Sequence, residues 1–255
     1  MTARTWYRIG LRLLVVAAVL GLWQLLCTVG AVDSITVSSP STVWHQVATW
    51  ISDGSLWPTA LHTLVTFAIG YGLGVVVGVV IGVAMGASDA FRLYMDPFIL
   101  FFNAIPKLVL VPLMIAWLGF TRTPGVIIVF LVVVFLVAIT VEKGMSEIEG
   151  DFVDNARMLG AGRVGLLREV YLPAVAIWVM TSARLGVGLA FQAAVVAEFF
   201  GAGHGLGFLI VQGEQTYTAS QIWGAIVVTV VLAWVIDFLL GLVDRRVSRW
   251  MPAQG

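Results

Sequence analysis

The chain has 255 residues, of which 60% are hydrophobic and 11% charged, and its formal net charge is +0. Soluble domains carry roughly 25% charged residues, so this composition excludes a soluble globular protein and predicts an all-α integral membrane protein. A balanced net charge gives no basic field, and therefore no sign of a nucleic-acid partner. The single cysteine, Cys27, excludes an internal disulfide.

Six apolar stretches are long enough to cross a bilayer, whose hydrocarbon core needs about 20 helical residues. They cover residues 9–30, 59–87, 98–119, 124–142, 174–200 and 222–243, and we expect a single transmembrane domain over residues 1–255. The first stretch has a basic start like a signal peptide. Its apolar part is too long for one and the small-residue site near Ala31 is poor, so we predict a retained span.

The distribution of Lys and Arg predicts the orientation. One side, made of both tails and the even-numbered loops, holds eleven of these residues: Arg4, Arg8, Arg12, Arg92, Lys143, Arg157, Arg163, Arg168, Arg245, Arg246 and Arg249. The other side holds only Arg122. We therefore expect cytoplasmic N and C termini and a cytoplasmic loop over residues 143–171.

The segment after the first span predicts a short helix on the outer side. Ser39 followed by Pro40 is a typical helix start. Four apolar residues then share one face: Val43, Val47, Trp50 and Ile51. With Trp44 and Trp57 nearby, this pattern indicates a helix lying in the membrane interface; a docking surface for an outside partner is the alternative.

The second span carries a glycine at every fourth position. These are Gly70, Gly74, Gly78, Gly82 and Gly86. The spacing places them on one helix face, where another backbone can approach closely. The pattern predicts tight helix packing and a candidate sliding surface, and it specifies no chemistry.

Four ionisable residues fall within the predicted spans, where charge is costly unless it faces protein or water. They are Lys107, Arg184, Glu198 and Asp237. Arg184 and Asp237 lie at comparable depths, so they are candidates for an ion pair. In the alternative, Lys107 and Arg184 line a route for an anion, and all four residues belong to the translocation pathway.

Lys107 lies between two prolines, Pro106 and Pro112, each of which removes a backbone donor. A helix broken twice beside a lysine is typical of a cavity wall. A packing kink with a snorkelling Lys107 fits equally well. Farther on, glycines at 201, 203, 205 and 207 predict a tight, re-entrant loop that contains His204.

The sequence contains none of the motifs that would make this chain an enzyme. It has no G-x-x-x-x-G-K-[ST], G-x-S-x-G or H-E-x-x-H, and its histidines, His45, His62 and His204, are scattered. We therefore expect no catalytic residue, no metal and no cofactor in this chain.

The polar loop before the fifth span has a distinctive pattern, "DNARMLGAGRVGLLREVYLP". Two helical turns end at the "GAG" of residues 160–162, and an amphipathic segment then leads to Pro173. The spacing resembles the EAA loop of bacterial ABC importer permeases, written E-A-A-x3-G-x9-I-x-L-P. The matching positions are Asp154, Asn155, Ala156, Gly160, Ala161, Gly162, Leu172 and Pro173, with Asp and Asn as departures from Glu and Ala.

Four other stretches, "IPKLVLVPLMIAWLG", "GVVIGVAMG", "SPSTVW" and "VVAEFFGAGHGLGFLI", are similar to the permease subfamily for nitrate, taurine, sulfonates and thiamine precursors. The resemblance implies the type I importer permease fold in a bacterial inner membrane. It implies a second permease copy or paralogue, and two ATPase subunits that bind ATP and Mg. These ATPase subunits would dock on the cytoplasmic loop of residues 143–171, which we call the coupling loop. It also implies an extracytoplasmic binding protein.

The resemblance favours an ATP-driven importer of a small anion such as a sulfonate, taurine or nitrate. A thiamine-precursor, riboflavin-like or aromatic acid permease is the alternative within the class. An ATP-independent channel or secondary carrier is the alternative from another class, because intramembrane charges and broken helices also occur there.

Overall fold

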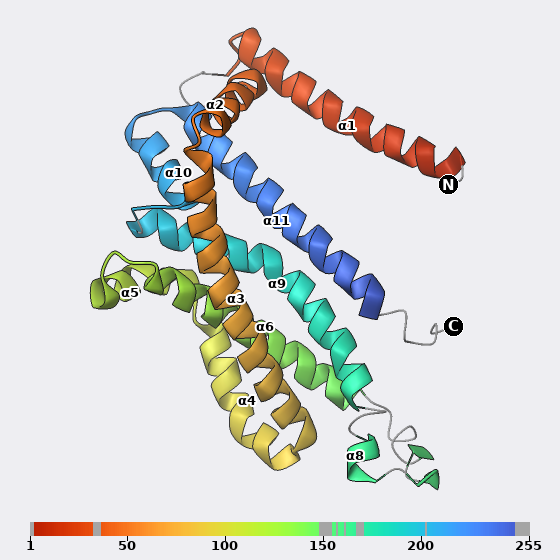
Figure 1. Cartoon of the computed structure of the whole chain (residues 1–255). Coiled ribbons are helices and arrows are strands. Elements are labelled where there is room, and N and C mark those ends of the chain that lie inside the picture. The colour runs from red at the N-terminus through yellow and green to blue at the C-terminus, as the bar shows by residue number, and fades with distance from the viewer. Residues whose placement is uncertain are drawn as a thin grey trace.

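The computed structural model describes residues 3–32, 37–147, 155–156, 158–160, 162–166, 171–201 and 203–247. All assigned elements in these ranges are helical (Figure 1). They are α1 (Ala3–Thr28), α2 (Pro40–Ser52), α3 (Leu56–Ala87), α4 (Asp89–Ala104), the 3-10 helix η1 (Lys107–Leu110), α5 (Val111–Leu118), α6 (Thr123–Ser146), α8 (Arg163–Leu166), α9 (Leu172–Gly201), α10 (Leu206–Gln215) and α11 (Ala219–Val247).

Four described helices are long and apolar enough to cross a membrane: α3, α6, α9 and α11. A fifth span results if α4 and the segment Lys107–Leu118, which meet at a 72° bend, count as one. Residues Leu14–Thr28 of α1 form a shorter apolar helix. The structure thus gives four or five spans by length and composition, and the sixth remains the prediction made for residues 9–30.

The core lies where α3, α6 and α9 pack together. Along α6, Val129, Val133, Val137 and Val141 are all 0% exposed. Phe191 of α9 stacks on Phe67 of α3, with ring centroids 4.3 Å apart. Figure 1 shows α3 crossing over α6 and α9, and these three helices form the frame from which the other elements extend.

The glycines of α3 lie directly against the valines of α6. A Cβ atom added at Gly74 would come within 2.7 Å of Val133 Cβ, and one at Gly78 within 2.8 Å of Val137 Cβ. Carbonyl oxygens of α6 are equally close, for example Val134 O at 2.8 Å from the same position on Gly78. Both helices repeat every four residues, so each valine fits beside one glycine. The seam between α3 and α6 is therefore interlocked.

The short outer helix α2 forms as its start signal predicts. The Ser39 side chain accepts a hydrogen bond from Thr42 N at 3.3 Å, and Pro40 occupies the first turn. The surroundings of its apolar face differ from the prediction. Val47 and Trp50 pack into a cluster with residues of α10 and α11, while Ile51 is 47% exposed. The protein, rather than the lipid interface alone, therefore covers most of this face.

The third predicted span is one bent segment. Its first helix starts at Asp89, well before residue 98, and ends at Ala104; the extended backbone of the capping residue Ile105 (ψ 127°) then precedes Pro106. Pro112 lies in the first turn of α5, where its missing N–H removes no helical hydrogen bond. Of the two predicted breaks, Pro106 lies at the 72° bend, and Pro112 lies where the 3-10 helix η1 is followed by α5.

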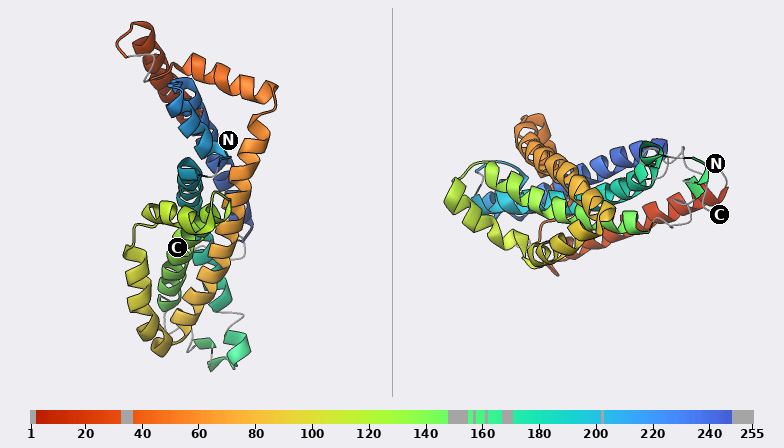
Figure 2. Two further views of the ribbon diagram at one scale, coloured as in Figure 1. Left: turned by 90° about the vertical axis from the view of Figure 1, so that its left-hand side faces the viewer. Right: turned by 90° about the horizontal axis from the view of Figure 1, so that it is seen from below.

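The glycine-rich segment after α9 is a tight turn followed by the helix α10. The sequence did not predict this helix, because glycine is common at its start. Gly203 and Gly205 have positive φ values of 64° and 99°. Figures 1 and 2 show α10 beside the top of α11 and near α2, whereas α8 lies at the opposite end of the molecule. In the predicted orientation, α2 and α10 mark the outer end and α8 the cytoplasmic end.

Candidate functional site

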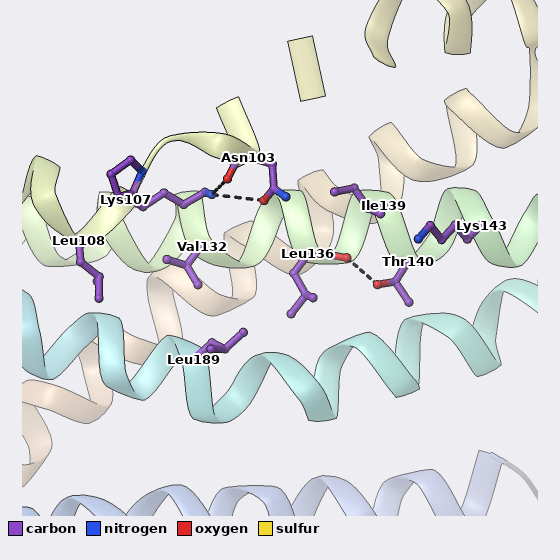
Figure 3. Close-up of a pocket in the computed structure, with 10 residues that line it drawn as sticks. Asn103, Lys107, Leu108, Val132, Leu136, Ile139, Thr140, Lys143 and Leu189 are labelled. Atoms are coloured by element: carbon purple, nitrogen blue, oxygen red, sulfur yellow. Dashed lines mark hydrogen bonds between the residues drawn. The ribbon is translucent and has the colours of Figure 1, made fainter. Parts of the chain in front are cut away.

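A cavity of about 640 Å³ lies beside the break in the third span (Figure 3). The bend between α4 and η1 places Lys107 in its wall. Lys107 Nζ donates to the Asn103 carbonyl oxygen at 3.1 Å and to Asn103 Oδ1 at 3.3 Å. The ammonium group also lies 5.3 Å from the centre of the Phe135 ring. These contacts hold the ammonium group of Lys107 in the cavity wall.

The cavity has a second lysine, Lys143, in the last turn of α6, at the end that the predicted orientation places toward the cytoplasm. Figure 3 shows Lys107 and Lys143 toward opposite ends of the group of lining residues, with Thr140 beside Lys143. Eight residues separate Phe135 from Lys143, or about 12 Å along α6. These are the only lysines in the chain. The described lining residues include no Asp or Glu, and the wall between the lysines is apolar, formed by Val132, Leu136 and Leu189.

Arg184 and Asp237 form the ion pair that the sequence offered as one of two alternatives. Arg184 Nε lies 3.4 Å from Asp237 Oδ1, and Nη2 lies 3.4 Å from Oδ2. The pair joins α9 to α11. Neither residue is among those lining the Lys107 cavity, so the proposed joint role of Lys107 and Arg184 in one wall has no support from this geometry.

Glu198 is buried, at 1% exposure, and ties three helices together. Thr63 Oγ1 donates to Glu198 Oε2 at 2.8 Å, and Gly207 N donates to the same oxygen at 3.2 Å. His62 Nδ1 lies 3.1 Å from Oε1. The next donor, Leu206 N, is satisfied by Thr63 Oγ1 at 2.9 Å. Because Gly205 has no side chain to cap α10, Thr63 and Glu198 satisfy its first N–H groups instead.

The glycines around Glu198 follow from this contact. A Cβ atom at Gly205 would overlap the Glu198 carboxyl group, and one at Gly207 would overlap Val195 O. Glu198 is therefore an anchor at the outer end of α9 and does not line the Lys107 cavity. The four intramembrane charges occupy three separate places, and only Lys107 faces this cavity.

The described part of the coupling loop has a helix–turn–helix form. Leu159 N donates to Asn155 O at 3.0 Å, closing a helical turn around Ala156. Gly160 then adopts a φ of +89°, and Leu166 N donates to Gly162 O at 2.9 Å in the following helix α8. Asp154 and Ala161 lie outside the described residues, and only the backbone of Leu172 and Pro173, at the start of α9, is described.

The loop presents two large apolar side chains. Met158 and Leu159 are 79% and 90% exposed. They lie at the end of the molecule that the charge distribution places in the cytoplasm, in a segment with no membrane span of its own. Exposed apolar side chains on a short helix are typical of a surface that enters a groove on a partner.

The sequence missed several residues of these sites. Lys143 was assigned to the loop because it follows the apolar stretch, although α6 continues to Ser146. His62 and Thr63 are separated from Glu198 by more than 130 residues, and no local pattern links them. Among the described residues, no group of three or more His, Cys, Asp or Glu side chains is arranged to hold a metal ion.

This chain is similar to known proteins over most of its length. Residues 70–251 match the family described as binding-protein-dependent transport system inner membrane component. A probable ABC transporter permease of Brucella melitensis is 30% identical over 95% of this chain and 97% of its own length. A putative aliphatic sulfonates transport permease, SsuC of Escherichia coli, is 30% identical over 92% of this chain and 89% of its own length.

The fold is also that of a solved transporter subunit. A chain of the MetNI methionine ABC transporter, in an inward-facing conformation, superposes with a TM-score of 0.64 at 21% identity, covering 73% of this chain and 93% of that one. This likeness shows the fold, and the family match with the 30% identical relatives assigns the class. The chain belongs to the binding-protein-dependent transport system inner membrane component family and is a multi-pass ABC transporter permease, a transporter subunit and not an enzyme.

Proposed function

We propose that this permease forms the pathway through which a small anion, of the sulfonate, taurine or nitrate class, is imported at the expense of ATP hydrolysed by separate subunits. The observation that carries the proposal is the cavity that holds both lysines of the chain. The relative named for aliphatic sulfonates supports the same class of solute.

The chemistry of the cavity favours an anion with a short apolar body. Lys107 uses Asn103 as acceptor, but an ammonium group has three donors, so it retains capacity for a solute oxygen. Lys143 offers a second positive charge toward the cytoplasmic end. No carboxylate among the described lining residues competes with the solute for these groups. The apolar wall between the lysines suits the hydrocarbon part of an aliphatic sulfonate.

The energy source is proposed to lie in other chains. The sequence has no P-loop, so ATP and Mg would bind to two cytoplasmic ATPase subunits. Met158 and Leu159 are the side chains that would enter a groove on each ATPase. A second permease copy or paralogue would complete the pathway, and an extracytoplasmic binding protein would deliver the solute.

The interlocked seam between α3 and α6 suggests how motion is transmitted. Sliding by less than one helical turn would drive valine side chains into the α3 backbone. We therefore expect α3 and α6 to move as one rigid body when the ATPases close, carrying the Lys107 cavity wall with them. A closing ligand such as ATP can shift this equilibrium only through its differential affinity for the two states.

The test is uptake by the complete complex in proteoliposomes, with labelled ethanesulfonate and taurine as probes. Lys107→Gln removes the charge while keeping hydrogen-bonding groups, and Lys107→Arg is the matched control that keeps the charge. Losing one charged hydrogen bond costs about 1.5–3 kcal/mol. We expect KM for the solute to rise roughly tenfold or more in Lys107→Gln, and much less in Lys107→Arg. Equal uptake by both variants, or transport of cations only, would reject the anion pathway.

A further inference from the structure

A second hollow, of about 570 Å³, opens at the outer end of α3, away from the Lys107 cavity. Three separate segments form it: the start of α3, the residue before α6, and the turn that leads into α10. Its basic side carries Arg122, His62 and His204, and its apolar side includes Leu61, Val65 and Phe208. No Asp or Glu is among the described residues that line it.

Buried contacts fix the imidazole of His62 in this hollow. Its Nδ1 lies 3.1 Å from Glu198 Oε1, and Glu198 is held in turn by Thr63 and the first turn of α10. Because the two ring nitrogens diverge, the Glu198 contact directs Nε2 of His62 away from the carboxylate. The His204 ring lies 5.8 Å from the His62 ring, centroid to centroid. Two imidazoles and a guanidinium thus share one small volume.

The remaining charge of the site favours an anion. Glu198 does not line the hollow: it is 1% exposed, accepts from Thr63 and Gly207, and meets His62 and Arg122 at a small void beside it. Arg122 supplies a permanent positive charge with a planar set of donors that suits sulfonate and carboxylate groups. It is also the only Lys or Arg that the charge distribution places on the outer side.

We propose that this outer hollow binds the anionic group of a small organic acid, a sulfonate or carboxylate, before the solute reaches the Lys107 cavity. Arg122 and His204 contact the charged oxygens, the ring of His62 forms part of the wall, and Phe208 with Leu61 covers the apolar part. This inference rests on the proposed function in one respect, since it takes the solute to be an anion. An anionic lipid headgroup has the same chemistry and is separated from the solute by the experiment.

The experiment is saturation-transfer NMR on the permease–ATPase complex in phosphatidylcholine nanodiscs, with ethanesulfonate as the probe. The variants are Arg122→Gln and His204→Gln, both at exposed positions, with Arg122→Lys and Lys107→Gln as controls. We expect Arg122→Gln and His204→Gln each to weaken ethanesulfonate binding about fivefold or more, while Arg122→Lys keeps most of it. Because the Lys107 cavity also binds ethanesulfonate, each variant is measured in the Lys107→Gln background, where the binding that remains reports the outer hollow.

Three results would overturn the outer site. The outer site is rejected, and the proposed function stands, if ethanesulfonate binding is unchanged in Arg122→Gln and His204→Gln. The same holds if this binding is already lost in Lys107→Gln alone. Binding abolished by adding phosphatidylglycerol to the nanodisc, with no loss of uptake, assigns the hollow to a lipid headgroup. An uptake assay that shows transport of neutral or cationic solutes alone would instead reject the proposed function, which separates the two failures.

Discussion

The seam between α3 and α6 predicts that one added methyl group destabilises the permease at Gly78 but not at Gly72. A Cβ atom at Gly78 would lie 2.8 Å from both Val134 O and Val137 Cβ, well inside contact distance. Neither obstacle can turn away, because one is backbone and the other is a buried branched side chain. Gly72 lies on the same helix, and a Cβ atom there meets nothing within 4 Å.

The magnitude follows from two opposing effects. Overpacking costs about 1–3 kcal/mol, and replacing a helical glycine by alanine returns about 1 kcal/mol of propensity. Gly78→Ala should therefore lose up to about 2 kcal/mol, which is up to roughly 8 °C of Tm for a chain of this size, and it should lie about 1–3 kcal/mol below Gly72→Ala. Gly72→Ala gains propensity without the clash and should keep or raise Tm.

The assay is thermal unfolding of the purified permease in detergent, followed by size-exclusion chromatography of the soluble fraction. The triple variant Gly74→Ala, Gly78→Ala, Gly82→Ala should fail to assemble, because each position has its own contact below 3 Å. Equal Tm values for Gly72→Ala and Gly78→Ala would refute the interlocked seam and with it the rigid movement of α3 with α6.

Three further predictions follow from the other contacts. Glu198→Ala strands the Gly207 N–H and the Thr63 hydroxyl and should cost about 3 kcal/mol of stability, whereas Glu198→Gln keeps an acceptor and should cost less than half of that, as measured by the same Tm assay. Leu159→Asp should abolish ATPase binding in a pull-down while the permease still inserts, and Leu73→Asp would fail at insertion instead. Asp237→Arg should lower expression and Tm, and adding Arg184→Asp should recover most of the loss, if the pair at 3.4 Å orders α9 against α11.

The sequence predicted the helices well because their signals are local. Apolar length located the spans, Ser39 and Pro40 marked the start of α2, and the glycine repeat indicated close packing. The partner of that glycine face is non-local, and only the structure assigns it to α6. The valines at four-residue spacing in residues 129–141 match the glycine period. This signal appears only when the two stretches are compared with each other.

The candidate site was less accessible to sequence reasoning. Equal depth correctly paired Arg184 with Asp237, but depth does not tell which charge lines a given cavity, and Glu198 lies outside the Lys107 cavity. Its true partners, His62 and Thr63, come from a helix far away in the chain. The helix α10 was missed because its glycine-rich start has no capping side chain of its own. Its first N–H groups are capped by Thr63 of α3 and Glu198 of α9.

The most direct test of the account is uptake of ethanesulfonate by proteoliposomes that contain this chain with or without its ATPase subunits, with ATP and the binding protein present in both cases. The account predicts accumulation only when the ATPase subunits are present, and its loss in Leu159→Asp and in Lys107→Gln. Accumulation or equilibration of ethanesulfonate by this chain alone would contradict it, because the chain would then be a self-sufficient channel or carrier.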